Sequence, residues 1–387
     1  MAHPTKVLAA AALLLGLAAS PALAQDEGTA AAQSRQISPE LKERIRDSYI
    51  FVFKDKIPAS AVNGAARSLV ARYGGDMRYV YEHAIKGFTA KMPAEAAEAM
   101  ARDRRIAYYE PDAIAFAMQS GGGDVGAQAQ TVDWGVRRVN GPGDGTNLGL
   151  YAFVIDTGVD LQHDDLNIAS SLHRNFAADG GNSAQDLNSH GTHVAGIIAA
   201  KNNAIDTVGV AAGAEVVSVR VLDANGSGSF SDVIAGVNHV ADVGLSGEVA
   251  NMSLGGPKSQ AVDDAVCAAA AQGIFFTVAA GNSTQNANWS SPARAGTCTN
   301  VYTISASDMN DELASFSNFA NPPVICADPG VEILSLNLGG GTRLLSGTSM
   351  AAPHAAGIFL QTNGVAYNGG TVSWDRDPNP DPICVLQ

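Results

Sequence analysis

The feature that most limits how this chain can fold is an alternation of apolar runs with alanine-rich stretches that starts at Tyr151. The runs are rich in valine and isoleucine, end in small or polar residues, and lie at 151–155, 215–221, 249–252, 274–278 and 301–305. Near-continuous apolar strands that alternate with helices indicate a parallel sheet covered on both faces. We therefore predict an α/β domain over residues 131–387, with its functional groups at the carboxyl ends of the strands.

Residues 25–118 have the pattern of a smaller, separate domain. The expected elements are a strand at 49–53, a helix at 59–73, a strand at 87–92, a helix opened by Pro93 and a strand at 106–110. This order predicts a ferredoxin-like α+β sandwich.

Between the two domains, residues 119–130 contain three consecutive glycines and a single bulky apolar residue, Val125. Such a composition is typical of an exposed, flexible linker, which is an easy place for proteolytic cutting. We expect the chain to be processed within this linker, near Ala127 to Thr131.

The N-terminus predicts export. Lys6 precedes an apolar stretch at 7–19, and small residues in an A-x-A pattern end at Ala24. This is the pattern of a secretory signal peptide over residues 1–24. A membrane anchor is the alternative, but the stretch is short, rich in alanine and followed by Pro21. No later segment is long and apolar enough to span a bilayer, so we expect a secreted protein, extracellular or periplasmic.

Charge and cysteine content narrow the function further. Residues 131–387 hold 24 of the 38 acidic residues but only 9 of the 24 basic ones, which disfavours nucleic acid as a partner. Export permits disulfides, and the four cysteines are Cys267, Cys298, Cys326 and Cys384. Three full pairings are possible, and structural bridges are favoured over a metal site because no CxxC occurs.

Asp156 and His190 stand where catalytic groups could act. Asp156 ends the first expected strand of the sheet, although a lone aspartate there is more often a helix cap or turn former. His190 lies in Ser-His-Gly-Thr-His-Val-Ala-Gly. His193 could form a metal pair with it, but no glutamate is placed as a zincin motif requires. One imidazole as a base and the other as a structural group fits better.

Ser349 and Asn282 supply the remaining chemistry. Ser349 stands in Gly-Thr-Ser-Met-Ala-Ala-Pro-His, and Pro353 indicates the first turn of a helix, so the serine is either an N-cap or a nucleophile. A serine needs a base to remove its proton before it attacks. Asn282 follows an apolar strand and offers an amide that can donate to an oxyanion. Nucleophile, base, orienting carboxylate and oxyanion donor are the set that acyl transfer requires.

These four motifs, in the order Asp, His, Asn, Ser, resemble those of the subtilisin family and are closest to its proteinase K branch. The resemblance covers about residues 131–361. The preceding domain is similar to the inhibitory propeptide of that family. The resemblance implies a three-layer α/β peptidase domain with a central, mostly parallel sheet, made as an inactive zymogen.

The resemblance also implies roles for the four residues. Asp156 would orient His190, which would take the proton from Ser349 and return it to the leaving amine. Ser349 would attack the peptide carbonyl and form an acyl-enzyme that water hydrolyses. Asn282 and the Ser349 backbone amide would stabilise the oxyanion. The implied activity is that of a secreted serine endopeptidase.

The substrate cleft follows from the same resemblance. The segment 251–255 matches the strand that pairs with an extended substrate, and Gly226, Ser227 and Gly228 resemble the facing segment. The first specificity pocket would be lined by Ser253, Leu254, Gly255, Ala279, Ala280 and Gly281. These residues are small and uncharged, so we expect broad specificity with apolar or aromatic side chains preferred before the cut.

The tail from Asn363 departs from the family, because Asp375, Asp377 and Asp381 lie among prolines where a closing helix is usual. Carboxylates in such loops are usually solvated, so the metal ligands stay unassigned. Family-type structural calcium is one expectation, and no cofactor is expected for catalysis. Cys267 and Cys298 flank the Asn282 strand, and a bridge between them is a hypothesis.

Two alternatives keep the fold and change the function. A catalytically silent secreted binding protein is disfavoured because no triad member is missing. An esterase or transpeptidase stays open, since an acyl-enzyme can be captured by other nucleophiles. The expected partners are protein or peptide substrates and the chain's own propeptide, and we expect a monomer.

Overall fold

A computed structural model describes residues 37–169, 171–179 and 181–387. The predicted signal peptide at 1–24 lies outside these residues. In the described part of the chain, none of the helices has both the length and the apolar character needed to cross a membrane.

The N-terminal domain is an antiparallel four-stranded sheet in the order β2-β3-β1-β4. Its elements are α1 (Pro39–Ile45), β1 (Ser48–Phe53), α2 (Ala59–Tyr73), β2 (Asp76–Tyr81), β3 (Gly87–Lys91), α3 (Ala94–Ala101) and β4 (Ile106–Pro111). The predicted ferredoxin-like fold is confirmed. Two further elements, α1 and β2, were not predicted from the sequence.

The two faces of this sheet bury different neighbours, because successive side chains of a strand point to opposite sides. Phe51 and Phe53 of β1 pack with α2 and α3 in a core of the domain's own. Ile50 and Val52 belong instead to a core shared with the C-terminal domain. Both faces of the sheet are therefore apolar. One face packs against the domain's own helices, and the other packs against the larger domain.

The C-terminal domain is built on a ten-stranded sheet that contains the predicted strands. The path through the sheet is β10-β12-β8-β14-β16-β17-β18-β22-β21, and β9 pairs with β12. The strands are β8 (Tyr151–Asp156), β9 (Asn167–Ile168), β10 (Arg174–Asn175), β12 (Glu215–Arg220), β14 (Val249–Met252), β16 (Phe275–Ala279), β17 (Val301–Ser307), β18 (Val324–Pro329), β21 (Tyr367–Thr371) and β22 (Pro382–Val385). From β12 to β18 all neighbours are parallel, as predicted.

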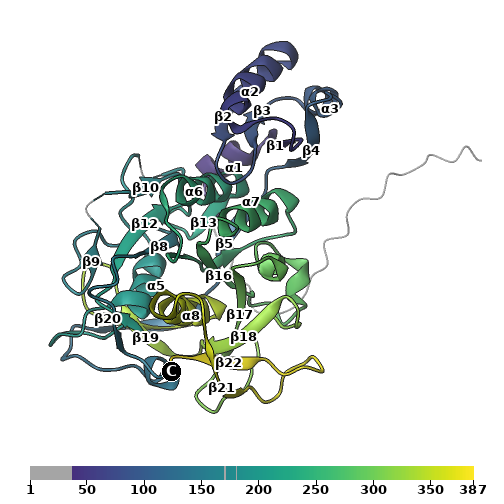
Figure 1. Cartoon of the computed structure of the whole chain (residues 1–387). Coiled ribbons are helices and arrows are strands. Elements are labelled where there is room, and N and C mark those ends of the chain that lie inside the picture. The colour runs from purple at the N-terminus through teal and green to yellow at the C-terminus, as the bar shows by residue number, and fades with distance from the viewer. Residues whose placement is uncertain (1–36, 170, 180) are drawn as a thin grey trace, which may run out of the picture. The chain divides into compact units, whose positions relative to one another are not determined.

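Helices cover both faces of this sheet, which makes three layers (Figure 1). On one face α5 (His190–Ala199) and α8 (Thr348–Thr362) share a core with Ala152 and Val154 of β8. On the other, α6 (Phe230–Val243) and α7 (Gln260–Ala270) pack with Phe153 and Ile155. Shorter elements are α4 (Trp134–Arg138), β7 (Gly143–Asp144), β11 (Ala211–Ala212), η1 (Ala287–Trp289), η2 (Ala293–Thr297), β19 (Ile333–Leu336) and β20 (Thr342–Ser346).

The segment predicted as a flexible linker is exposed but paired. Residues Ser120–Gly126 form strand β6, which runs antiparallel to β20. The reason is that β20 offers an open edge, and backbone pairing requires no apolar side chains. After the N-terminal domain, the chain thus runs alongside β20, the strand that directly precedes α8.

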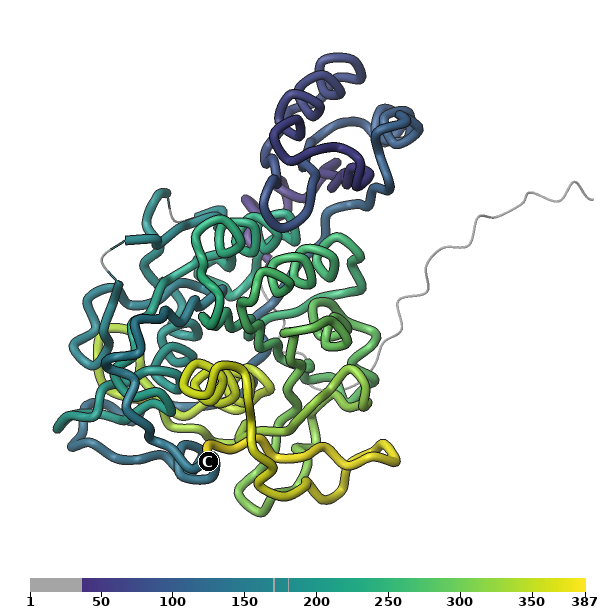
Figure 2. The backbone as a smooth tube through the Cα atoms, in the orientation of Figure 1, coloured from purple at the N-terminus to yellow at the C-terminus, as the bar shows by residue number. Residues whose placement is uncertain are grey.

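The C-terminal tail is a β-hairpin in place of a closing helix. Strand β22 pairs antiparallel with β21 and parallel with β18, so the tail extends the central sheet (Figure 2, yellow). The Cys326–Cys384 disulfide joins β18 to β22. The second bridge, Cys267–Cys298, is the hypothesised one.

Candidate active site

Asp156 and His190 meet at the carboxyl edge of the central sheet. Asp156 is the last residue of β8, and His190 is the first residue of α5. His190 Nδ1 lies 2.7 Å from Asp156 Oδ1, and neither side chain is exposed. His190 Nε2 has no hydrogen-bond partner among the described residues. The carboxylate therefore fixes the imidazole with its second nitrogen free for another group.

Ser349 is the second residue of α8 and is fully buried. Its Oγ donates to the carbonyl of Ser253 at 2.9 Å rather than to His190. The same Ser253 returns a hydrogen bond from its own Oγ to the Ser349 carbonyl, at 2.8 Å. Two reciprocal bonds hold the serine in a resting orientation.

Pro353 lies deeper in the helix than predicted, because α8 already begins at Thr348. A proline at this depth cannot supply the N–H that the carbonyl four residues earlier would accept. That carbonyl belongs to Ser349, and the hydroxyl of Ser253 takes the place of the missing donor. The proline is tolerated because Ser253, in the connection between β14 and β15, supplies the hydrogen bond that the helix lacks at this point.

Two donors converge on the carbonyl oxygen of Met118. Asn282 Nδ2 donates to it at 2.7 Å, and the backbone N–H of Ser349 donates at 3.2 Å. Gly347 leaves room for this arrangement, since a Cβ there would stand 2.3 Å from the same oxygen. The oxygen therefore sits where a developing oxyanion would be stabilised.

The residues before Met118 lie in the cleft as an extended strand. β5 (Ile114–Ala117) pairs antiparallel with β13 (Ser227–Ser229) on one side and β15 (Leu254–Gly255) on the other. Ala117 N–H also donates to Gly226, and Met118 N–H to Ser253. The predicted segments 226–228 and 253–255 thus enclose one strand of this chain.

The side chain of Met118 lies against Gly255, one of the residues predicted to line the first specificity pocket. A Cβ on Gly255 would lie 2.8 Å from the Met118 methyl carbon. Of the other predicted lining residues, Ala279 and Ala280 are buried, and Gly281 N–H donates to Thr348 Oγ1 at 3.1 Å. These three belong to the wall that carries Asn282.

Family comparison covers both domains of the chain. Residues 149–376 match the subtilase family, Peptidase S8, and residues 42–118 match the peptidase inhibitor I9 family. The first match alone spans more than half of the chain.

This chain belongs to the subtilase family.

Individual relatives of this subtilase match it over most of its length. The chain is 37% identical over 354 residues to "Subtilisin-like protease 7" of Arthroderma benhamiae, and the match covers 85% of this chain and 84% of that protein. It is 34% identical over 340 residues to "Proteinase R" of Parengyodontium album, covering 84% and 81%. A crystal structure of a cold adapted subtilisin-like serine proteinase superposes with a TM-score of 0.58 at 35% identity, covering 66% of this chain and 98% of that one. The chain is a subtilisin-like serine endopeptidase with an I9 propeptide.

The second histidine of the subtilase motif is structural. His193 is fully buried, and its Nε2 contacts the carbonyls of Ile333 and Arg343. Burial lowers its pKa to about 3, so the ring is neutral. The two backbone carbonyls at Nε2 fit the structural role that the sequence favoured for one of the two histidines.

The I9 propeptide caps the two helices on its side of the subtilase. Glu110 accepts a hydrogen bond from Gln260 N–H at 3.1 Å at the start of α7 and another from Ser259 Oγ. Asp112 accepts from Ser231 N–H at 3.0 Å and from Ser231 Oγ at 2.6 Å at the start of α6. Negative charges at these N-termini are favoured by the helix dipole.

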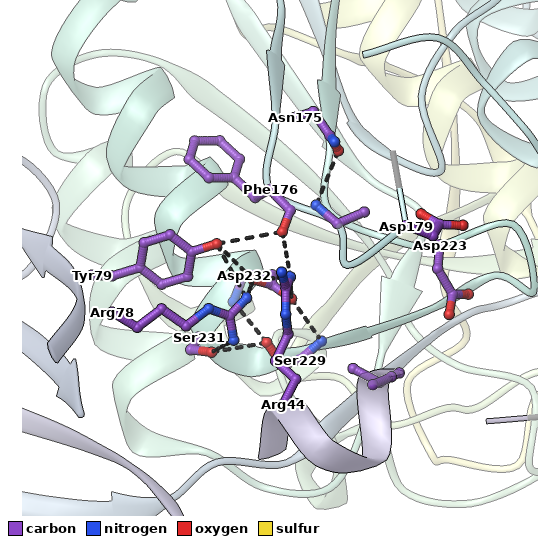
Figure 3. Close-up of polar contacts among 12 residues, drawn as sticks. Arg44, Arg78, Tyr79, Asn175, Phe176, Asp179, Asp223, Ser229, Ser231 and Asp232 are labelled. Carbon is purple, nitrogen blue, oxygen red and sulfur yellow. Dashed lines mark hydrogen bonds and ion pairs between the residues drawn. The ribbon is translucent and has the colours of Figure 1, made fainter. Parts of the chain in front are cut away.

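A charge cluster lies beside this contact (Figure 3). Asp232, fully buried in the first turn of α6, accepts hydrogen bonds from the propeptide residues Arg44, Arg78 and Tyr79. Arg44 also donates to the Phe176 carbonyl at 2.7 Å. One buried carboxylate thus pairs with two guanidinium groups from the inhibitor domain.

Three residues of the site had no role in the expectations from sequence: Met118, Asp232 and Gly347, which was noted only as part of the Ser349 motif. Gly347 carries a recognisable signal, because a glycine two positions before the nucleophile can adopt the φ of 152° found here. Met118 and Asp232 carry no such local signal. Met118 is 164 residues from its partner Asn282, and Asp232 is 154 residues from its partner Arg78. Only the folded chain brings these pairs together.

Proposed function

We propose that Asp156, His190, Ser349 and Asn282 carry out peptide hydrolysis in this subtilase, and that its first substrate is its own Met118–Gln119 bond. The observation that carries the proposal is the Met118 carbonyl oxygen between Asn282 Nδ2 and Ser349 N–H. The inhibitor domain ends there, at the last residue of the I9 match. The cut therefore lies before the 127–131 stretch that sequence composition favoured.

In the first half of the reaction, Ser349 Oγ turns from the Ser253 carbonyl toward the free Nε2 of His190. His190 takes its proton, and the oxygen attacks the Met118 carbonyl carbon. Asp156 supports the positive imidazolium, while Asn282 and the Ser349 amide hold the negative oxygen. His190 then protonates the nitrogen of Gln119, the C–N bond breaks, and Met118 remains as an ester on Ser349.

In the second half, water replaces the amine. His190 removes a proton from the water, whose oxygen attacks the ester carbonyl, and the proton passes to Ser349 as the ester bond breaks. The products are a propeptide ending in the Met118 carboxylate and a peptidase starting at Gln119. The cleaved propeptide remains in the cleft through β5, which makes it a product inhibitor.

The test compares the full-length chain with its Ser349→Ala variant, using intact mass and hydrolysis of an unfolded protein. We expect the wild type to release a fragment that starts at Gln119 and to gain proteolytic activity, and the variant to stay uncut and inactive. Cutting of the variant in the absence of other proteases would contradict the assignment. So would an earliest wild-type product that starts between 127 and 131.

The same proposal includes secretion and an apolar preference. A secreted Ser349→Ala precursor is expected to start at Gln25, after removal of residues 1–24. Met118 in the pocket beside Gly255 supports a preference for unbranched or aromatic apolar side chains before the cut. Peptides that differ only at that position measure the preference through kcat/KM. The silent binding-protein alternative has no observation in its favour.

A structural calcium ion belongs to the proposal as well, beside Asp165 in the segment before β9. Asp165 is fully buried, and its Oδ2 has no partner among the described residues. Its Oδ1 accepts a hydrogen bond from Asn203 Nδ2 at 2.6 Å, which ties it to the loop after α5. The unpartnered carboxylate oxygen is what a Ca²⁺ ion would satisfy, and the ion would contribute to stability alone. Loss of a calcium-dependent rise in Tm in Asp165→Asn tests it.

A further inference from the structure

The C-terminal hairpin carries a cluster of aspartates that peptide hydrolysis does not use. Asp375, Asp377 and Asp381 lie in the loop between β21 and β22, and one carboxylate oxygen of each is within 4.8 Å of the other two. The subtilase match ends at residue 376, inside this loop. Most of the cluster therefore lies beyond the part of the chain that the family pattern describes.

Asp381 is the member that points to a ligand. Its side chain is fully buried, and its Oδ2 accepts a hydrogen bond from Ser305 Oγ of β17 at 2.7 Å. Its Oδ1 is also buried and has no hydrogen-bond partner in the described part of the chain. A buried carboxylate oxygen without a donor is costly unless a cation or a proton satisfies it.

The described part of the chain supplies no cation to this cluster. Arg376 lies between two of the aspartates in sequence, but its guanidinium donates to the Ser315 carbonyl at 3.2 Å and lies over the Phe319 ring. Among the described residues, no ion pair involves any of the three aspartates. Three carboxylates therefore face one another with uncompensated charge.

The spacing of the residues fits a cation loop. In Asp-Arg-Asp-Pro-Asn-Pro-Asp, an oxygen-bearing side chain stands at every second position from Asp375 to Asp381. Calcium loops place their first ligands at such alternate positions. Backbone N–H groups of Asp377 and Asp381 donate to Asp375, which curls the loop around its carboxylates. Only oxygen ligands are present, which favours calcium over softer metals.

We propose that Asp375, Asp377 and Asp381 bind a calcium ion that fastens the C-terminal hairpin to the central sheet. Asp381 reaches Ser305 on β17, and Asp377 Oδ2 accepts from Ala320 N–H at 3.1 Å. An ion among the three would thus join the tail to two earlier segments of the chain. The Cys326–Cys384 bridge anchors the same hairpin three residues after Asp381.

The test uses the Ser349→Ala precursor, so that self-digestion does not interfere and no activity is needed as a readout. Trp374 is 78% exposed and adjacent to Asp375, which makes it an antenna for terbium bound in the loop. We expect tryptophan-sensitised terbium emission that saturates and is displaced by calcium chloride. Calcium chloride is also expected to raise Tm.

Three variants separate this site from the one proposed at Asp165. Asp375→Asn with Asp377→Asn should weaken terbium binding at least about tenfold and remove the tail's share of the Tm rise. In EDTA the same variant should be at least as stable as its parent, because the removed charges repel each other when no ion is bound. Asp165→Asn should keep the emission, and Trp374→Phe should lose the emission but keep the Tm rise.

The proposal fails on either of two results. One is unchanged terbium affinity in the Asp375→Asn, Asp377→Asn variant. The other is a Tm loss of equal size with calcium and with EDTA, which would show that the carboxylates act through the loop's own hydrogen bonds.

Discussion

Asn282 Nδ2 donates a hydrogen bond of 2.7 Å to the Met118 carbonyl, across 164 residues of sequence. Met118 belongs to the inhibitor domain, and Asn282 belongs to the peptidase. In the mechanism proposed above, the precursor thereby presents one of its own peptide carbonyls to the two oxyanion donors. Inhibition and maturation would then use the same contacts.

We expect Asn282→Ala to slow cleavage of Met118–Gln119 and of added substrates by about 100- to 1,000-fold in kcat. The magnitude is the one known for the equivalent donor in subtilisin, a member of this family, and is adopted from it. The amide matters more as charge develops on the oxygen, so KM should change little. Steady-state kinetics measure both, and a change confined to KM would show that Asn282 serves ground-state binding.

Gly255→Ala should narrow the specificity pocket. The new methyl group would stand 2.8 Å from the Met118 methyl carbon and 3.3 Å from the Ser291 carbonyl oxygen. We expect kcat/KM for peptides with methionine or phenylalanine before the cut to fall about tenfold, since lost pocket contacts are worth about 1–3 kcal/mol. Peptides with alanine there are the matched control. An equal loss for all peptides would show a general distortion of the cleft.

Arg78→Ala should weaken the cleaved propeptide as an inhibitor. The change removes a charge-assisted hydrogen bond to the fully buried Asp232, and such bonds contribute about 1.5–3 kcal/mol. The inhibition constant should rise about 10- to 100-fold, with Arg44 left as the remaining guanidinium partner. Titration of the matured peptidase with each propeptide measures it.

Arg67→Ala is the control for this prediction, because it removes the same charge from an exposed site. Among the described residues, the Arg67 guanidinium donates to Asn63 inside the propeptide and to no other side chain. If the inhibition constants of both variant propeptides rose by the same factor, the net charge of the propeptide rather than the contact with Asp232 would be responsible. An unchanged inhibition constant for Arg78→Ala would contradict the prediction.

Asp112 should make the precursor more stable as the solution becomes mildly acidic. Burial raises the pKa of Asp112 to about 6 in the folded chain, against about 3.9 for an exposed aspartate. The folded state therefore binds the proton more tightly, and the contribution is present at low pH and lost as pH rises through 6. From pH 7 to 5 it amounts to about 1.4 kcal/mol.

The measurement is Tm against pH for Ser349→Ala and for Ser349→Ala with Asp112→Asn. The parent should gain stability relative to the Asn variant as pH falls from 7 to 5. Parallel curves would show that Asp112 keeps an ordinary pKa in the folded precursor.

The sequence by itself determined the layers of the fold and the chemical groups of the site. Apolar runs that alternate with helical stretches predicted the parallel strands, because buried parallel strands require such runs whatever their neighbours are. The helix at 59–73 and the motifs around Asp156, His190, Asn282 and Ser349 were equally local. Each signal lies within a few residues, so it is readable without knowledge of the fold.

Only the tertiary structure decided what those groups meet. The 119–130 segment has the composition of a linker, yet β6 pairs with β20 because backbone hydrogen bonds make no demand on side chains. Pro353 fits within α8 because Ser253 replaces a lost donor, and Asp381 is buried against Ser305. Met118 likewise meets Asn282 only because the fold brings β5 into the cleft. Such contacts join residues far apart in sequence, and their free energy depends on positions in space that no local pattern encodes.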